Sequence, residues 1–540
     1  MRRQPRRDVI AGVTVGLVAL PLALGFGESS GMGAGAGLIT AIVAGTVAAL
    51  FGGSHVQVSG PTGAMTVVLV PIIGRYGPGA VLAVGLMAGL ILMALAFLHA
   101  GRLIRYIPLP VVEGFTIGIA VIIGLQQLPS ALGVHVHAER VLGLAGAALS
   151  AGLAAPLWSS IGIAIATAAL ILIGARLRPG VPIPLIAVVL ATVLNRVLHL
   201  GAEPIGAIPS TIPAPALLPF QHWESLVLPA VAVAALAALE SLMSASAADG
   251  MTVNQRHDSD RELFGQGLAN LASPIFGGIP ATAAIARTAV NIRSGAASRA
   301  AALTHAALLL VIVLVAARWV SMIPLAALAG VLIATALQMV KVSSLRAILR
   351  ATRGDAVVLV VTAVATVAFD LVTAVILGLV VAGGFALRQA AQGAKLAEIP
   401  LEEHSHLDEE KALLDEHIVA YRLEGPLFFA AAHDFLLELS EISDVRVVVL
   451  RMSRLSAIDA TGAAVLADTI RRLESREVTV MLSGVRPEHQ KVLHQLGVYD
   501  QLAHERHLFA TTPEAIVHAR THAARRAHTP EHHHPSPATS

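Results

Sequence analysis

The residues most able to do chemistry lie within apolar stretches, where an ionisable side chain is costly. Glu240 stands in the middle of AALAALESLMSASAADG, and Ser244 follows four residues later, so both lie on one face of a helix. A charged group at such a depth costs about 2.5–3.5 kcal/mol, so it needs a function or a partner. A carboxylate with a hydroxyl one turn away suits a cation or a proton. The alternative is a carboxyl group that is hydrogen-bonded for packing alone.

A cationic side chain occurs in a second apolar stretch, GGIPATAAIARTAVN at 277–291. Arg287 follows the expected helix start by one to two turns, where it could complement an anion or pair with Glu240. The alternative is a cytoplasmic position, where it would anchor the helix in the interface. Thr62, Thr66 and Thr282 could donate hydroxyls to an anion, although threonine in membrane helices often bonds its own backbone.

Two stretches must position these groups: VSGPTGAMT at 58–66 and the 277–291 segment. Both are rich in small residues, which leave backbone amides accessible, and Pro61 and Pro280 suit the first turn of a helix. A half-helix that starts inside the membrane offers about half a positive charge at its N-terminus. Two such ends facing each other predict an anion site near the bilayer midplane. The alternative is a pair of ordinary, closely packed membrane helices.

Composition places these stretches in a polytopic helical membrane protein. The 540 residues are 55% hydrophobic and only 13% charged. Cysteine is absent, which excludes disulfides, thiolate catalysis and cysteine metal sites. The basic start, MRRQPRR, is interpreted as a cytoplasmic anchor rather than a signal peptide. The chain carries no Walker loop and no Ser-His-Asp pattern, so an ATP-driven pump is excluded within it and an enzyme is disfavoured.

Apolar segments up to residue 388 predict a transmembrane domain at 1–388 with fourteen crossings. Lys and Arg concentrate in the loops on the side of the N-terminus, as the positive-inside rule requires of cytoplasmic loops. The short Pro/Gly-interrupted segment is third in each half of seven. Corresponding broken helices predict an inverted repeat, about 8–199 and 225–388.

The composition changes after the last apolar segment. Residues 389–416 are polar and predict a linker, followed by a small α/β domain at 417–517. Its strands are expected at 417–423, 445–451 and 477–483, and its helices at 432–441, 460–474 and 487–496. The His/Pro-rich tail at 518–540 is expected to be disordered. Its HHH run at 532–534 could bind a metal weakly, but a solvated tail is the preferred interpretation.

Several long motifs resemble the SulP/SLC26 anion transporters over nearly the whole chain. They are ALPLALGFGESSG at 19–31, FGGSHVQVSGPTGAMTVV at 51–68, IPLPVVEGFTIGIAVIIGLQQL at 107–128 and HDSDRELFGQGLANLASPIFGGIPATAAIARTAVNIRSGA at 257–296. SAIDATGAAVL at 456–466 resembles the signature of a STAS domain. The resemblance implies a helical membrane domain with a 7+7 inverted repeat, a cytoplasmic α/β STAS domain, a homodimer and elevator-like movement of a transport core.

The resemblance also implies which residues form the sites. The substrate would bind between the third and tenth helices. Pro21 and Leu22 of the first segment would complete the wall of this site. Matched by position, the other residues of the substrate site are Thr62, Gly63, Ala64, Ala284, Ile285, Ala286 and Arg287. Glu240 and Ser244 match the acidic residue and hydroxyl that hold the coupling cation in sodium-dependent bicarbonate members. Glu240 stands where those members carry the shorter Asp, which favours a proton as the coupling ion. Arg287 resembles sulfate- and dicarboxylate-type members more than bicarbonate members.

The expected function is therefore secondary active transport of a small inorganic oxyanion, of sulfate or bicarbonate type, coupled to H+ or Na+. We expect a multi-pass protein of the plasma membrane without a cofactor or a certain metal site. A cytoplasmic regulatory protein is a possible partner of the STAS domain, and no nucleic acid is expected. A C4-dicarboxylate symporter is the first alternative. An anion channel or a STAS-based membrane sensor is an alternative of another class.

Overall fold

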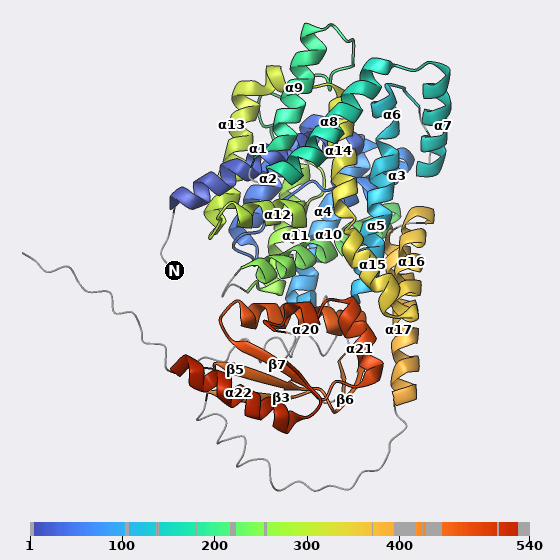
Figure 1. Cartoon of the computed structure of the whole chain (residues 1–540). Coiled ribbons are helices and arrows are strands. Elements are labelled where there is room, and N and C mark those ends of the chain that lie inside the picture. The colour runs from blue at the N-terminus through green and yellow to red at the C-terminus, as the bar shows by residue number, and fades with distance from the viewer. Residues whose placement is uncertain are drawn as a thin grey trace, which may run out of the picture. The chain divides into compact units, whose positions relative to one another are not determined.

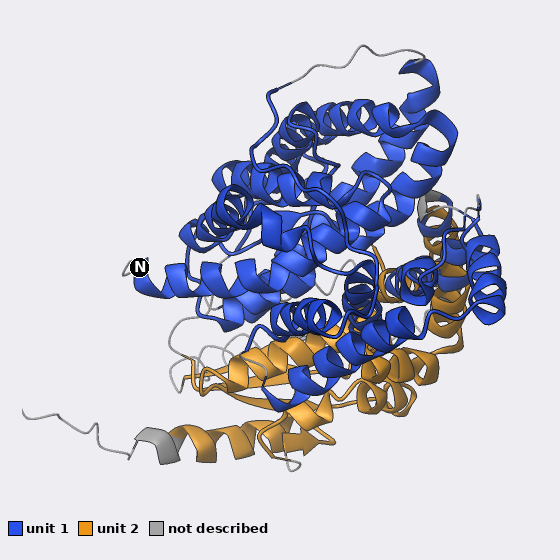
Figure 2. Ribbon diagram, turned by 90° about the horizontal axis from the view of Figure 1, so that it is seen from above, with its two compact units in different colours: residues 1–104, 115–340, 363–375 blue, residues 105–114, 341–362, 376–540 orange. Residues whose placement is uncertain are grey.

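The chain folds into a large set of apolar helices followed by a small α/β domain (Figure 1). The computed structural model describes residues 5–102, 107–136, 138, 140–178, 181–215, 223–252, 256–369, 371–393, 417–423, 425–427, 445–504 and 507–527. The chain divides into two compact units (Figure 2). The first contains residues 1–104, 115–340 and 363–375, and the second contains residues 105–114, 341–362 and 376–540.

The helices of the first half are α1 (Pro5–Ser29), α2 (Ala34–Phe51), α3 (Gly63–Tyr76), α4 (Pro78–Phe97), α5 (Leu109–Gln126), α6 (Leu128–Leu132), α7 (Val141–Ala154), α8 (Trp158–Leu177) and α9 (Ile183–Val197). Those of the second half are α10 (Trp223–Met251), α11 (Ser259–Ile275), α12 (Ile285–Arg293), α13 (Arg299–Val320), α14 (Leu325–Met339), α15 (Val342–Ala351), α16 (Arg353–Ala368) and α17 (Leu371–Gly393). Within the described ranges, 8 helices are long and apolar enough to cross a membrane. The predicted class, a polytopic helical protein with a C-terminal α/β domain, is confirmed. The count of fourteen crossings and the inverted repeat stay predictions.

Glycine lets the first two helices pack backbone against backbone. A Cβ at Gly37 of α2 would lie 2.0 Å from the carbonyl oxygen of Ala23 and 2.7 Å from the Cα of Gly27, both in α1. Lipid tails are as apolar as leucine, so close approach of this kind supplies much of the association between membrane helices.

Substitution at this contact predicts a loss of folded protein. Gly37→Val forces α1 and α2 apart, at a cost of about 1–3 kcal/mol or more for an overpacked core. We expect a lower unfolding temperature and less monodisperse protein in detergent. Gly146→Val is the control, because a Cβ on this helical glycine would meet nothing within 4 Å. Equal stability of the two variants would contradict the packing assignment.

The C-terminal domain is built on a parallel sheet in the order β3-β5-β7-β8. Its strands are β3 (Ile418–Arg422), β5 (Val447–Arg451), β7 (Thr479–Ser483) and β8 (Leu508–Phe509), and a separate parallel pair joins β4 (Gly425–Leu427) to β6 (Leu455–Ile458). Alternate residues of β5 face opposite sides. Val448 and Leu450 join the core under α20 (Ala460–Glu474) and α21 (Pro487–Gln495), whereas Val447 and Val449 pack with α22 (Thr512–Ala527).

Two boundaries of the predicted layout are wrong. Disorder from His518 onward is incorrect up to Ala527, because α22 continues to that residue and buries Ala515, Ala519 and Ala523 against the sheet. Its alanine- and histidine-rich composition resembled a tail. The linker expected from residue 389 begins later, because α17 extends to Gly393. The expected helix at 432–441, the rest of the linker at 394–416 and the HHH run at 532–534 lie outside the described residues.

Candidate anion-binding site

The two small-residue stretches meet in a short antiparallel bridge. Strand β1 (Ser59–Gly60) pairs with β2 (Thr282–Ala283), with Ser59 opposite Ala283 and Gly60 opposite Thr282. Just beyond this pairing, the amide of Ala284 donates to the carbonyl oxygen of Val58 at 3.2 Å. Helix α3 begins at Gly63 and α12 at Ile285, each a few residues after its strand. The bridge therefore brings together the starts of two short helices that are far apart in sequence.

Both helices are too short to cross a membrane alone. With 14 and 9 residues, α3 and α12 fall below the roughly 20 residues that a span needs. Thr62 caps α3, because its Oγ1 accepts from the amide of Met65 at 3.3 Å. Ala284 is the cap residue of α12 and supplies no side-chain bond. The first residues of α12, Ile285 and Ala286, are exposed. The first amides of a helix lack intrahelical partners and can bind an anion.

Arg287 of α12 brings a positively charged guanidinium to the bridge, and one of its hydrogen-bond donors is unpaired among the described residues. The residue is only 2% exposed, and its Nη2 donates to the carbonyl oxygen of Pro61 at 2.7 Å. Its Nη1 is buried and has no hydrogen-bond partner in the described part of the chain. An unpaired buried donor costs about 1–3 kcal/mol, more when it is charged. An anion bound beside Nη1 would remove that cost.

Glu240 contacts residues from both of the segments that form the bridge. Its Oε2 accepts from the hydroxyl of Thr282 at 2.5 Å and from that of Thr62 at 2.8 Å. One carboxylate oxygen thus joins α10 to the cap of α3 and to β2. The hydroxyl of Ser244, one turn further along α10, lies 3.2 Å from that of Thr288 in α12. Ser244 and Glu240 share a helix face as predicted, but they contact different neighbours.

The remaining candidate residues lie in α3 and in α1. Gly63 and Ala64 are buried in the first turn of α3, and Pro21 and Leu22 are buried in α1, which packs against both α3 and α12. Thr66 bonds its own helix, because its hydroxyl donates to the carbonyl oxygen of Thr62 at 2.9 Å. The structure therefore brings Thr62, Thr282, Glu240 and Arg287 to one place and removes Thr66 as an obvious anion donor.

A row of buried polar residues on α11 holds β1 and the residue just before β2, and the sequence interpretation missed its role. Gln266 donates to the hydroxyl of Ser59 at 2.6 Å and to Glu262 at 3.0 Å. Asn270 exchanges two bonds with the backbone of Ala281, each at 2.9 Å. Glu262, Gln266 and Asn270 stand four residues apart, so they share one helix face. That spacing within ELFGQGLAN was the available signal.

Comparisons with known proteins agree with this architecture. The sulfate permease family matches residues 6–362, and the STAS domain matches residues 412–515. A protein of Bacillus subtilis (strain 168) named "Putative sulfate transporter YvdB" is 34% identical over 525 residues, covering 93% of this chain and 96% of that protein. The bicarbonate transporter BicA of Picosynechococcus sp. is 29% identical over 541 residues, covering 96% of this chain and 95% of that protein.

Solved structures match as well. The transmembrane domain of a cyanobacterial bicarbonate transporter BicA superposes with a TM-score of 0.63 at 31% identity, covering 71% of this chain and 98% of that one. Murine Slc26a9, an anion transporter in the inward-facing state, superposes with a TM-score of 0.67 over 96% of this chain and 92% of that one. Its 16% identity makes this second likeness one of fold alone.

Proposed function

We propose that this chain, which belongs to the sulfate permease family, is a secondary active transporter of a small oxyanion of sulfate or bicarbonate type. Relatives named as sulfate and bicarbonate transporters support the substrate class. The observation that carries the proposal is the buried Nη1 of Arg287, which lacks a partner among the described residues beside the starts of α3 and α12. We place the anion there, in contact with Arg287 and the first amides of both half-helices.

If the anion carries two charges, the charges of the site favour transport together with a cation. Arg287 and two half-helix ends of about +0.5 each sum to about +2. An ionised Glu240 reduces this sum to about +1, and a protonated one leaves about +2. A doubly charged oxyanion is therefore balanced only when Glu240 has taken up a proton or holds a cation. Moving the loaded site across an apolar barrier costs least when its net charge is small.

The contacts of Glu240 give the coupling a physical route. Thr62 and Thr282 both donate to its Oε2, an arrangement that suits a carboxylate. A proton or a cation on Oε2 itself would compete with these two hydroxyls, so at least one of the two bonds would rearrange. Because Thr62 also caps α3, we propose that occupation of Glu240 by H+ or Na+ adjusts the start of that helix. Ser244 would act through Thr288 rather than through Glu240 directly.

We further propose that the core carrying α3 and α12 moves in an elevator-like way within a homodimer in the plasma membrane. The N-terminus and the STAS domain would be cytoplasmic, in keeping with the basic loops. The STAS domain would receive a regulatory protein. A C4-dicarboxylate symporter and an anion channel are the competing functions.

Uptake into proteoliposomes separates these functions. Labelled sulfate, bicarbonate and fumarate are each offered with an imposed proton or sodium gradient. We expect one inorganic anion to accumulate against its own gradient when one of the two cation gradients is present. Accumulation of fumarate alone would indicate a dicarboxylate symporter. Flux that only follows the anion's own gradient would indicate a channel. Failure of all three anions to move in folded protein would contradict the proposal.

Gly60 tests the geometry of the site without changing a charge. A Cβ at this position would lie 2.5 Å from Nη1 of Arg287, so an added methyl group must displace the guanidinium. We expect Gly60→Ala to lower the rate of anion uptake at least about tenfold, because 1 Å of misplacement can cost about 100-fold. Gly124→Ala is the control, since a Cβ there would meet no atom within 4 Å. Unchanged uptake by Gly60→Ala would count against the placement of the anion.

A further inference from the structure

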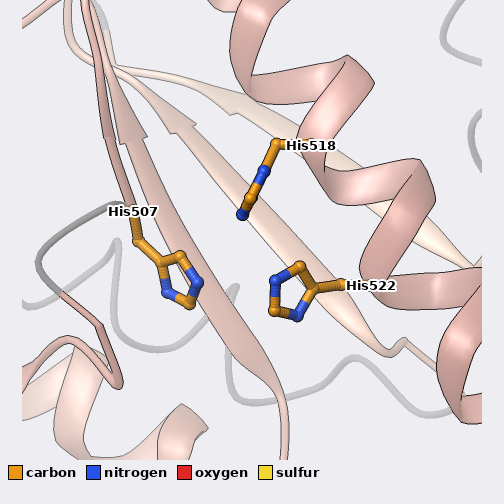
Figure 3. A group of neighbouring side chains, drawn as sticks. All are labelled: His507, His518 and His522. Carbon is orange, nitrogen blue, oxygen red and sulfur yellow. The ribbon is translucent and has the colours of Figure 1, made fainter.

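Three histidines converge in the C-terminal domain. His507 immediately precedes β8, and His518 and His522 stand one turn apart on α22. Figure 3 shows their rings directed toward one another, with two contributed by the helix. One ring nitrogen from each residue lies within 4.8 Å of the other two.

Burial makes this cluster more than a surface feature. His507 is only 3% exposed, and its Nδ1 has no hydrogen-bond partner within the described ranges. A buried nitrogen without a hydrogen-bond partner is unfavourable, and a bound ligand would remove that cost.

Ring packing alone is the competing explanation. The ring centroids of the three histidines lie 4.9–5.8 Å apart, which is also typical of aromatic contacts. Such contacts do not satisfy the Nδ1 of His507. The four-residue spacing of His518 and His522 also directs both rings to one side of the helix, as in helical zinc sites. These two features favour a ligand.

We propose that His507, His518 and His522 form a zinc site that joins the edge strand β8 to α22. Tetrahedral zinc with bonds of about 2.0–2.1 Å places its ligand atoms roughly 3.4 Å apart, so small side-chain rotations close the site from its present spacing. The fourth ligand is water or His504, whose ring centroid lies 6.0 Å from that of His507. Bound zinc would stabilise the packing of α22 on the sheet.

Zinc binding by the full chain in detergent tests the proposal. The protein is purified without a histidine tag, and His528, His532, His533 and His534, which lie outside the described residues, are replaced by serine in every sample. We expect one zinc ion per chain in equilibrium dialysis, and a cobalt spectrum typical of tetrahedral nitrogen ligands. His518→Asn and His522→Asn should each weaken binding at least about tenfold, the lower end of what even indirect support of a metal ligand contributes.

His494→Asn is the matched control, because this exposed histidine lies on α21 and outside the cluster. It should bind zinc as the parent does. The unfolding temperature of each cluster variant, measured without metal, shows whether that variant still folds. His518→Gln is used in place of any variant that does not fold. Zinc binding that is absent from the parent, or equal in the parent and both cluster variants, would overturn the proposal.

Discussion

Arg287→Met is expected to reduce anion uptake at least about 100-fold while the protein remains folded. The substitution removes the donor Nη1, the bond from Nη2 to Pro61 and a full positive charge. Hydrogen bonds to charged groups contribute about 1.5–3 kcal/mol each, and 1.4 kcal/mol corresponds to a factor of ten. Some loss of stability is expected, because the carbonyl oxygen of Pro61 loses its donor and Glu240 loses a nearby positive charge. Initial uptake rates and the unfolding temperature are the two measurements.

Two further variants show whether geometry or charge accounts for the loss. Arg287→Lys retains the charge but not the planar fork, so one nitrogen cannot reach both Pro61 and the anion, and intermediate uptake is expected. Arg293→Met changes an exposed arginine in the last turn of the same helix and should transport normally. Normal uptake by Arg287→Met, or an equal loss in Arg293→Met, would contradict the role given to Arg287.

Glu240→Gln is expected to separate anion binding from coupling. Glutamine keeps the size of the side chain and an oxygen that can accept from Thr62 and Thr282, but it cannot take up a proton at neutral pH. Stimulation of uptake by the driving cation gradient should fall at least about tenfold. Removing a negative charge beside the anion should leave its binding intact or tighter. Gradient-driven uptake and anion exchange at equal cation concentrations are measured on the same vesicles.

Glu224→Gln provides the matched control, because it makes the same change at an exposed residue in the first turn of the same helix. It should remain coupled. If Glu240→Gln still accumulates the anion in response to the gradient, Glu240 does not bind the coupling ion. Loss of both exchange and driven uptake would assign Glu240 to the structure of the site rather than to coupling.

The sequence was most informative where local chemistry decides the structure. Proline and small residues at 58–66 and 277–291 predicted two short helices, but the expected first-turn position of the prolines is wrong. Pro61 precedes Thr62, the cap residue of α3, and Pro280 precedes β2. The cost of burying charge singled out Glu240 and Arg287 without knowledge of their neighbours. The predicted strands at 445–451 and 477–483 correspond to β5 and β7, which the structure pairs in parallel.

Long-range contacts were not predictable in the same way. The bridge between β1 and β2 has two residues in each strand, too few for a periodic pattern. Helix spacing placed Ser244 on the face of Glu240, but it could not show that Thr288 is the neighbour. The polar face of α11 has a role only because β1 and the residue just before β2 lie against it. Likewise, the apolar face of α22 became evident only from its packing against the sheet.

The absence of native cysteine permits a direct test of where the anion binds. Ala286→Cys places one thiol in the exposed first turn of α12, and Ala297→Cys places one at an exposed position beyond that helix. The rate of modification by a small charged thiol reagent is measured with and without the anion identified by uptake. We predict that the anion slows modification at position 286 and leaves position 297 unchanged. Equal rates at position 286 with and without a saturating transported anion would contradict a binding site at the start of α12.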